Sequence, residues 1–175
     1  MSTRVLIYGS PILRKHSEEL TENENTSELI ENLFKTLEVE GGIGLAAPQI
    51  GVLKRLFIMD TTRMEASNKP EDHFKRVVIN PQILEVSQRE TYYNEGCLSF
   101  PDLYEEVERP ESIRVQYLDQ EFKPIVRQIG GIEARIFQHE YDHLEGVLFV
   151  DRISSIKRTI ITGKLKRLQR LSTKR

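Results

Sequence analysis

The sequence has one cysteine, no tryptophan and no long apolar run, and two of these shortages exclude whole classes of protein. Cys97 has no second cysteine to pair with, so the chain is not a secreted domain held together by internal disulfides. No run of about 18 apolar residues occurs, which predicts that no helix spans a membrane. The opening residues 1–10 hold only the short apolar run 5–7, too little for a secretory signal, and we expect a cytoplasmic protein.

Acidic and basic residues are distributed unevenly along the chain. The net charge of the 175 residues is only −2, but residues 1–152 hold 17 lysines and arginines against all 27 acidic residues. Residues 153–175 hold 8 basic residues and no acidic one. The length and the 38% hydrophobic content fit a single domain. We therefore expect an acidic body over 1–152 and a basic tail of the same domain over 153–175, whose charge suits a polyanionic partner.

Apolar spacing predicts helices at both ends of the chain with strands between them. We expect a helix that Ser27 caps and glycines 41–42 end, a second over residues 132–144, and a last one from about residue 154. Strand-like runs, with Asn80-Pro81 as a turn between two of them, occupy residues 56–59, 77–79, 83–86, 113–118 and 125–129. Because the strands are grouped without βαβ alternation, we expect an α+β fold.

Two of the four histidines lie in the segment His-Glu-Tyr-Asp-His at residues 139–143. In a helix, positions i and i+4 face the same side, so His139 and His143 can both reach one tetrahedral metal while Glu140 handles a proton. The alternative is a pair of histidines on a solvated helix face. The helical context and the flanking glycines favour the metal site.

A catalytic metal site requires a third protein ligand, and here this ligand has to lie upstream. No histidine follows His143, the side chain of Glu145 faces away from it in a helix, and Asp151 comes after the glycine break. Thiolate chemistry favours Cys97, although a lone cysteine is commonly a small buried apolar residue. The candidates are Cys97, His16, His73 or a carboxylate.

A glycine-rich segment, Gly-Ile-Gly-Leu-Ala-Ala at residues 42–47, formally matches the dinucleotide-binding pattern but has the wrong context. That pattern needs a strand before it and a helix after it, whereas here a helix precedes it and Pro48 follows. We interpret it as an extended strand whose backbone can pair with an extended peptide, with the Gln49 amide as a donor at its end. The alternative is a tight strand crossing under a sheet.

Three segments together resemble the signature motifs of peptide deformylases. They occur in the family's order and at compatible spacings, as Gly-Ile-Gly-Leu-Ala-Ala-Pro-Gln at 42–49, Glu-Gly-Cys-Leu-Ser at 95–99 and Gln-His-Glu-Tyr-Asp-His-Leu at 138–144. The resemblance covers nearly the whole chain, because further matching segments lie at 11–14, 134–135 and 148–152. Ser10 and Phe100 depart from the family's pattern, and we expect Phe100 to narrow access to a peptide groove.

The resemblance implies a fold, a reaction and a metal. The fold is α+β, with antiparallel β-sheets packed around a central helix that carries the histidine motif, plus a C-terminal helix. The reaction is hydrolysis of the N-terminal formyl group of formyl-methionyl polypeptides, which releases formate. The cofactor is one divalent metal, usually Fe²⁺ with Zn²⁺ or Ni²⁺ able to substitute, and its ligands would be Cys97, His139 and His143.

The resemblance also implies roles for further residues. Glu140 would take a proton from water activated by the metal and pass it to the leaving amine. The Gln49 side chain and the Leu98 N–H would donate hydrogen bonds to the developing oxyanion. Glu95 and Arg109 resemble an ion pair that steadies the cysteine loop. By the same resemblance, the substrate-binding residues are Ile43, Gly44, Gly96, Ile132, Arg135 and Ile136.

The tail and two other functions stay open at this stage. In bacterial members the C-terminal helix helps to bind the ribosome, and the basic tail suits contact with ribosomal RNA, although an amphipathic helix with a solvated basic face fits it equally. The alternatives to a deformylase are a general metallopeptidase, which would share His139, Glu140 and His143, and a non-catalytic ribosome-associated factor. As partners we expect newly synthesised polypeptides, and neither DNA nor a membrane.

Overall fold

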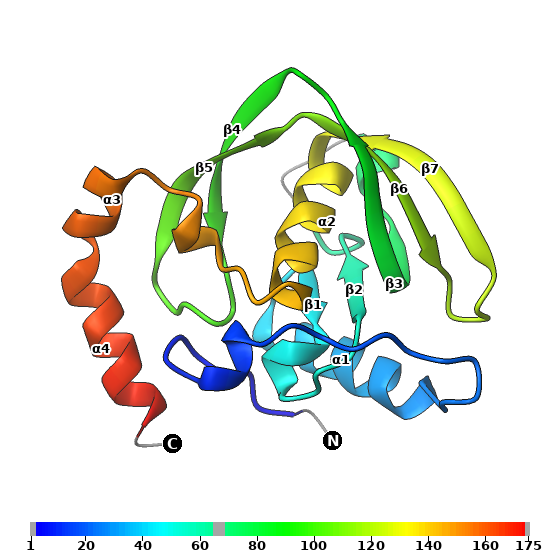
Figure 1. Ribbon diagram of the computed structural model, residues 1–175, viewed down its shortest axis with the longest axis horizontal. Coiled ribbons are helices and arrows are strands. Elements are labelled where there is room, and N and C mark those ends of the chain that lie inside the picture. Colours follow the sequence, from blue (N-terminus) through cyan, green and yellow to red (C-terminus); the bar gives the residue numbers. More distant parts are fainter. Residues whose placement is uncertain (1–2, 65–68, 174–175) are drawn as a thin grey trace.

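The computed structural model describes residues 3–64 and 69–173, and it contains two antiparallel sheets around one central helix (Figure 1). The five-stranded sheet has the order β1-β2-β3-β6-β7, and β4 and β5 form a separate pair. The strands are β1 (Gly44–Ala46), β2 (Leu56–Asp60), β3 (Lys75–Val86), β4 (Glu90–Gly96), β5 (Tyr104–Pro110), β6 (Ser112–Leu118) and β7 (Pro124–Gly130). The helices are α1 (Ser27–Glu40), α2 (Gly131–Leu144), α3 (Ser155–Ile160) and α4 (Thr162–Ser172). Within the described residues, none of these helices is long and apolar enough to cross a membrane.

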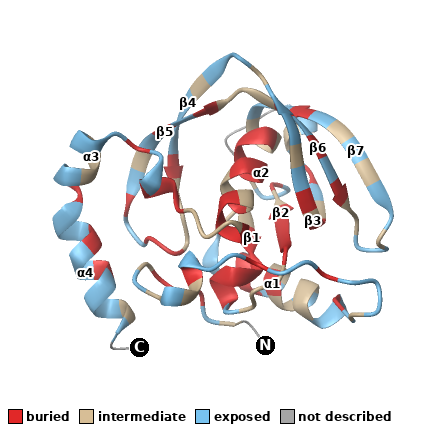
Figure 2. Cartoon of the chain, in the orientation of Figure 1, coloured by how far each residue is buried: buried red, intermediate tan, exposed pale blue. Residues whose placement is uncertain are grey.

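Helices α1 and α2 confirm two of the predicted helices. α1 begins at Ser27, with Thr26 rather than Ser27 in the capping position, and it ends at Gly41. α2 is buried along most of its length, because the five-stranded sheet packs against one side and β4 and β5 contact the other (Figure 2). A central helix between antiparallel sheets is the α+β arrangement predicted from the sequence.

The strand predictions are confirmed in part and corrected in part. β2, β6 and β7 cover three of the predicted runs. The runs at 77–79 and 83–86 form the single strand β3, because Asn80-Pro81 makes a bulge, with a φ of +48° at Asn80, instead of a turn. The pattern does not predict β4 and β5, since their sequences are rich in glutamate, which is depleted in strands.

The predicted C-terminal helix is two helices that meet at Ile161. The spacing of the apolar residues 156, 160, 161, 165, 168 and 171 predicts one apolar face along a single helix. On α3, however, Ile156 and Ile160 are 73% and 76% exposed, so these two side chains are not part of a buried face. On α4, Leu165 and Leu168 are buried in a cluster with apolar residues from the N-terminal segment and from the turn after α2. The C-terminal segment therefore packs on the same body as the rest of the chain.

The largest part of the core lies between α2 and the five-stranded sheet. The rings of Phe57 on β2 and Phe137 on α2 meet edge to face with centroids 5.1 Å apart, and Ala134, Ile136 and Leu144 belong to the same cluster. These contacts hold α2 at a fixed position. Its remaining side chains therefore lie at defined places next to β1 and next to the loop that follows β4.

Two glycines with similar backbone angles allow a test of the packing around the turn after α2. Gly146 has a φ of +70°, and a Cβ added there would lie 2.6 Å from the Arg14 carbonyl oxygen, whereas Gly41 has a φ of +73° and no atom within 4 Å of an added Cβ. Gly41→Ala should therefore lower the free energy of unfolding by about 1 kcal/mol through backbone strain alone. Gly146→Ala must also displace the backbone at Arg14 and should lower it by about 3 kcal/mol. Urea unfolding measures both, and equal losses would contradict the close contact.

Candidate active site

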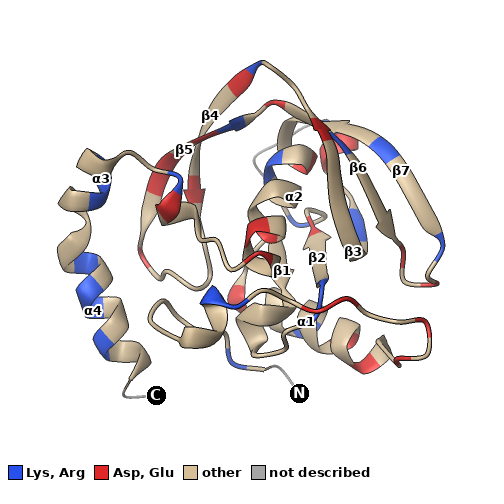
Figure 3. Ribbon diagram, in the orientation of Figure 1, with Lys and Arg blue, Asp and Glu red and all other residues tan. Residues whose placement is uncertain are grey.

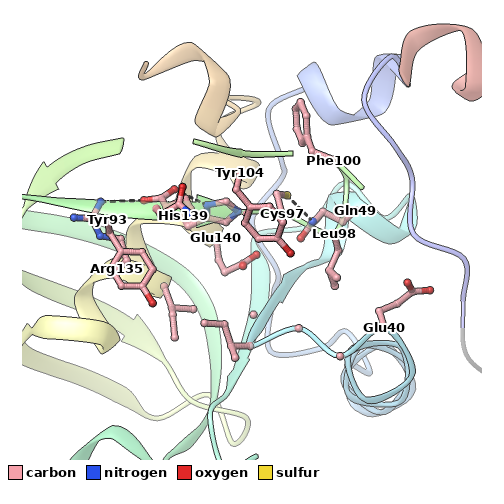
Figure 4. A pocket seen from close by; sticks show the side chains of 18 of the residues that line it. Glu40, Gln49, Tyr93, Cys97, Leu98, Phe100, Tyr104, Arg135, His139 and Glu140 are labelled. Carbon is pink, nitrogen blue, oxygen red and sulfur yellow. Dashed lines mark hydrogen bonds and ion pairs between the residues drawn. The ribbon is translucent and has the colours of Figure 1, made fainter. Parts of the chain in front are cut away.

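A cavity of about 440 Å³ opens between β1, the loop after β4 and helix α2 (Figure 4). Its lining brings together residues from the three motif segments. Gln49 comes from the first segment, Cys97 from the second, and His139 and Glu140 from the third. Segments that are about 50 residues apart along the chain therefore meet in one pocket.

Three side chains that could hold a metal ion converge beside this pocket. The donor atoms of Cys97, His139 and His143 all lie within 4.8 Å of one another, and Cys97 Sγ is 3.3 Å from His143 Nε2. His139 and His143 stand one helical turn apart on α2, with ring centroids 5.2 Å apart. This arrangement fits three protein ligands of one tetrahedral ion with the fourth position open.

The other residues considered as ligands lie elsewhere. His16 Nδ1 lies 3.0 Å from Glu145 Oε2, and His73 Nδ1 lies 3.3 Å from the carbonyl oxygen of Thr61. Among the described residues, Cys97 and the histidines of α2 are the one group that could hold an ion in this way. The alternative of two histidines on a solvated helix face is wrong, because the side chain of His139 is 11% exposed and His143 is 2% exposed.

The two histidines differ in their tendency to bind a proton. Burial lowers the pKa of His143 well below its usual value, so its imidazole is neutral, which is the form that binds a metal. Burial also lowers the pKa of His139, but hydrogen bonds to Cys97 and Glu95 outweigh this effect and raise the pKa well above its usual value. The surroundings of His139 thus favour a positive charge, which a bound metal ion would supply in place of the proton.

A buried carboxylate orients His139. Glu95 Oε2 lies 2.9 Å from His139 Nδ1, which leaves the other ring nitrogen to face Cys97. Arg109 donates to both oxygens of Glu95, at 2.7 and 3.0 Å, and Arg135 adds a third hydrogen bond at 3.0 Å. Burial raises the pKa of Glu95, but the hydrogen bonds from His139 and Arg109 outweigh burial and hold this pKa well below its usual value. Glu95 therefore stays ionised and holds the ring of His139 through its Nδ1 atom.

Two residues that the sequence analysis did not single out extend this network. Asp142 Oδ2 accepts a hydrogen bond from Arg109 Nη1 at 2.7 Å, and Arg152 donates to both oxygens of the same carboxylate at 2.5 Å. The one available signal was the position of Asp142 inside the histidine motif. No local pattern indicates that its partners lie on β5 and after α2.

Glu140 is a buried carboxylate beside the metal-ligating side chains. It is 4% exposed, and its Oε2 has no hydrogen-bond partner among the described residues. A Cβ added at Gly44 would lie 2.5 Å from Glu140 Oε1, so glycine at this position leaves the room that the carboxylate occupies. Burial is the main cause that raises the pKa of Glu140 to about 7. A carboxylate with this pKa can both accept and release a proton near neutral pH.

The Gln49 amide has a defined orientation. Its Oε1 accepts a hydrogen bond from the Ala46 N–H at 2.8 Å, and its Nε2 donates to Ser99 Oγ at 3.2 Å and lies 3.6 Å from Cys97 Sγ. Because the backbone engages the oxygen, the nitrogen is the end of the amide that faces the metal-ligating thiol. Leu98, the residue after Cys97, lines the same pocket.

The residues expected to contact a substrate all line the cavity, and they are Ile43, Gly44, Gly96, Ile132, Arg135 and Ile136. β1 is the end strand of its sheet, so the edge that is not paired with β2 can accept an extended peptide. The Arg135 guanidinium is buried and donates to Glu95 and Thr91, with Tyr93 over it at 5.8 Å. Tyr93 and Tyr104, which the sequence analysis did not name, are exposed and also line the pocket.

Phe100 is one of the residues that line the cavity, although almost all of its side chain is buried, and the expectation that it narrows access stays a prediction. Its side chain is 1% exposed, and its ring packs against Tyr8 and Phe149 with centroids 4.9 Å apart in both pairs. In Figure 4 the ring points away from the metal-ligating side chains. The apolar cluster beneath α4 therefore takes up the bulk of this residue.

Comparison with known sequences gives one consistent family. The family model described as polypeptide deformylase matches residues 2–159. The peptide deformylase of Thermotoga maritima is 40% identical over 168 residues, which cover 95% of this chain and 96% of the relative. The peptide deformylase of Flavobacterium johnsoniae is 41% identical over 169 residues, which cover 92% of this chain and 86% of the relative.

Solved structures agree with the sequence matches. A peptide deformylase from Plasmodium falciparum has a TM-score of 0.86 and 36% identity, with 95% of each chain covered. A peptide deformylase from Legionella pneumophila has a TM-score of 0.83 and 35% identity, with 100% of this chain and 99% of that chain covered. Sequence and fold thus match over nearly the full length. This chain therefore belongs to the peptide deformylase family, the enzymes that remove the N-terminal formyl group from newly made polypeptides.

Proposed function

We propose that this enzyme deformylates formyl-methionyl chains with one divalent ion held by Cys97, His139 and His143. Fe²⁺ is the native metal in this proposal, and Zn²⁺ or Ni²⁺ can replace it. The observation that carries the proposal is the convergence of these three donors beside the unpartnered carboxylate oxygen of Glu140. A thiolate with two imidazoles suits transition metals of this kind and does not suit Mg²⁺ or Ca²⁺.

The residues around this ion have separate roles in the hydrolysis. A metal held by Cys97, His139 and His143 would make water a better nucleophile near neutral pH and would polarise the formyl carbonyl. Glu140 accepts the proton of the attacking water and delivers it to the leaving amine, and its raised pKa suits both steps. The Gln49 amide and the Leu98 N–H donate to the formyl oxygen as negative charge develops on it. Glu95 and Arg109 keep the cysteine loop and His139 in place for these steps.

The peptide binds extended between two backbone segments. Ile43 and Gly44 offer the open edge of β1 on one side, and Gly96 and Leu98 lie on the other side of the cavity. An extended main chain can hydrogen-bond to both sides without regard to its side chains, which suits an enzyme that meets many different nascent chains. The methionine side chain lies against walls made by Ile43, Ile132, Arg135 and Ile136.

The C-terminal segment gives the enzyme a second contact, with the ribosome. We assign residues 1–152 to the catalytic domain and 153–175 to a basic tail of that domain, in a cytoplasmic protein. α4 buries Leu165 and Leu168 while its lysines and arginines are exposed, and no acidic residue lies on α3 or α4 (Figure 3). A basic face on a docked helix suits the phosphates of ribosomal RNA near the point where nascent chains emerge.

Formate release from a short formyl-methionyl peptide tests the reaction. With Fe²⁺-loaded protein kept free of oxygen, we expect release from the wild type and a loss of at least about a hundredfold in Glu140→Ala, since the variant lacks the proton carrier. Metal analysis is the control, because Glu140 is not a ligand in this proposal and the variant should keep its metal. No release from fully metal-loaded wild type, or undiminished release from Glu140→Ala, would contradict the proposal.

Gln49→Leu tests the oxyanion donor while keeping the side-chain volume similar. We expect kcat to fall by about a hundredfold with unchanged metal content, because one donor to the developing charge is lost. Ser99→Ala is the matched control, since Ser99 Oγ accepts the other hydrogen of the same amide nitrogen and has no role in the reaction. Steady-state kinetics on the same peptide compare the two variants. Equal losses would show that Gln49 acts only as part of the packing.

Charge reversal on α4 tests the ribosome contact. Replacing Lys164, Lys166, Arg167 and Arg170 by glutamate should abolish cosedimentation with ribosomes and leave activity on a short peptide unchanged, because these side chains are exposed and far from the cavity. Replacing Lys75, Arg89, Arg114 and Lys123 by glutamate, four exposed basic residues outside the tail, controls for the same change in net charge. The proposed ribosome contact would be contradicted if the α4 variant still cosedimented with ribosomes, or if the control variant also failed to cosediment.

A further inference from the structure

Arg152 connects the segment after α2 back to the last turn of α2. Its Nε donates to Asp142 Oδ2 and its Nη2 donates to Asp142 Oδ1, both at 2.5 Å. The two side chains differ in environment, since that of Asp142 is 5% exposed and that of Arg152 is 43% exposed. A partly exposed guanidinium thus covers a buried carboxylate with a two-point hydrogen bond.

The same carboxylate belongs to the network behind the metal-ligating histidine. Asp142 Oδ2 also accepts from Arg109 Nη1 at 2.7 Å. Through its Nε and Nη2, Arg109 holds both oxygens of Glu95, and Glu95 Oε2 lies 2.9 Å from His139 Nδ1. A continuous series of charged hydrogen bonds therefore runs from the surface at Arg152 to the ring of His139.

The charges of this series show what Arg152 contributes. Glu95 and Asp142 are two buried carboxylates that share the single guanidinium of Arg109. With Arg152 present, Asp142 has a cationic partner of its own, so Arg109 can keep both of its hydrogen bonds to Glu95. Without Arg152, the buried Asp142 would have Arg109 as its remaining cationic partner, and a buried carboxylate pulls strongly on such a partner. Arg109 would then shift toward Asp142, and Glu95 would lose the two-point hydrogen bond from Arg109 and keep only the single one from Arg135.

We propose that Arg152 and Asp142 are positioning residues for the metal site. Arg152 satisfies Asp142, so that Arg109 remains bidentate on Glu95 and Glu95 keeps the ring of His139 aimed at the metal. This inference rests on the metal site proposed above and adds two residues to the groups that orient its ligands. It also gives the turn after α2 a role in the chemistry, because the segment that leads to α3 carries one of the charges on which the ligand geometry depends.

Helix α3 carries a matched control residue. The side chain of Arg158 is also 43% exposed and also forms an ion pair with an aspartate, Asp151, at 2.9 Å. Asp151 bonds in addition to Arg14, in the N-terminal segment, and not to the network around Glu95. Arg158→Gln therefore removes an equally exposed guanidinium whose aspartate partner is not hydrogen-bonded to the network behind His139, whereas Arg152→Gln removes one whose partner is.

The experiment uses the full chain loaded with Ni²⁺, whose thiolate absorption bands report on the ligand geometry. The wild type, Arg152→Gln, Arg152→Lys and Arg158→Gln are compared in absorption, in the rate of Ni²⁺ loss to a chelator, and in kcat and KM on a short formyl-methionyl peptide. For Arg152→Gln we expect shifted bands, metal loss about tenfold faster and a lower kcat at similar KM. Arg152→Lys should lie between, because lysine keeps the charge but not the two-point fork. Arg158→Gln should match the wild type.

Two results would overturn the inference. One is an Arg152→Gln protein that keeps the wild-type absorption bands and the wild-type rate of metal loss. If such a protein unfolded at lower urea concentration, Arg152 would stabilise the fold without orienting the metal ligands. The other is an Arg158→Gln protein that changes as much as Arg152→Gln. Should Arg152→Gln fail to fold, Arg152→Lys decides by the same two readouts. Wild-type protein that binds no Ni²⁺ would instead contradict the metal site itself, so the two failures are distinguishable.

Discussion

The buried guanidinium of Arg109 joins the parts of the structure on which the site depends. It extends from β5 and bonds to Glu95 on β4 and to Asp142 on α2. An unpaired charge at this depth is strongly destabilising, so the two-stranded sheet can pack against α2 only where all three groups are satisfied. The loop that carries Cys97 follows directly from β4. Its distance from the histidines is therefore set by this contact between charged groups.

Helix α2 meets two different requirements on its two sides. One side carries apolar residues that pack on the five-stranded sheet and hold the helix in place. The other side carries metal-ligating and charged groups, including Glu140, whose buried carboxylate oxygen has no partner among the described residues. A carboxylate in that state opposes folding. The apolar contacts elsewhere on α2 offset this cost.

A strand or helix is predicted correctly where the residues of that segment alone favour it, and it is missed where contacts with other segments decide the structure. β2, β6 and β7 are rich in apolar or β-branched residues, and the pattern predicts them. β4 and β5 carry five glutamates between them, a composition typical of an exposed loop. Glu95 and Arg109 are nevertheless paired inside the protein. The break at Ile161 and the burial of Phe100 escape prediction for a related reason. Both follow from where the C-terminal segment docks, and docking is not a property of the segment alone.

The sequence by itself determined the family, the candidate metal-binding residues and the one-turn spacing of His139 and His143, because these rest on residue chemistry and on helix geometry within one turn. From the residues alone, the third ligand stayed open among several candidates. Only the tertiary structure decided that Cys97 meets the two histidines, that the Gln49 oxygen is engaged by the backbone, and that Arg152 reaches Asp142. Most of these contacts join segments that are distant along the chain or on opposite sides of a turn. Their separation in space is set by packing, and no local pattern of residues encodes it.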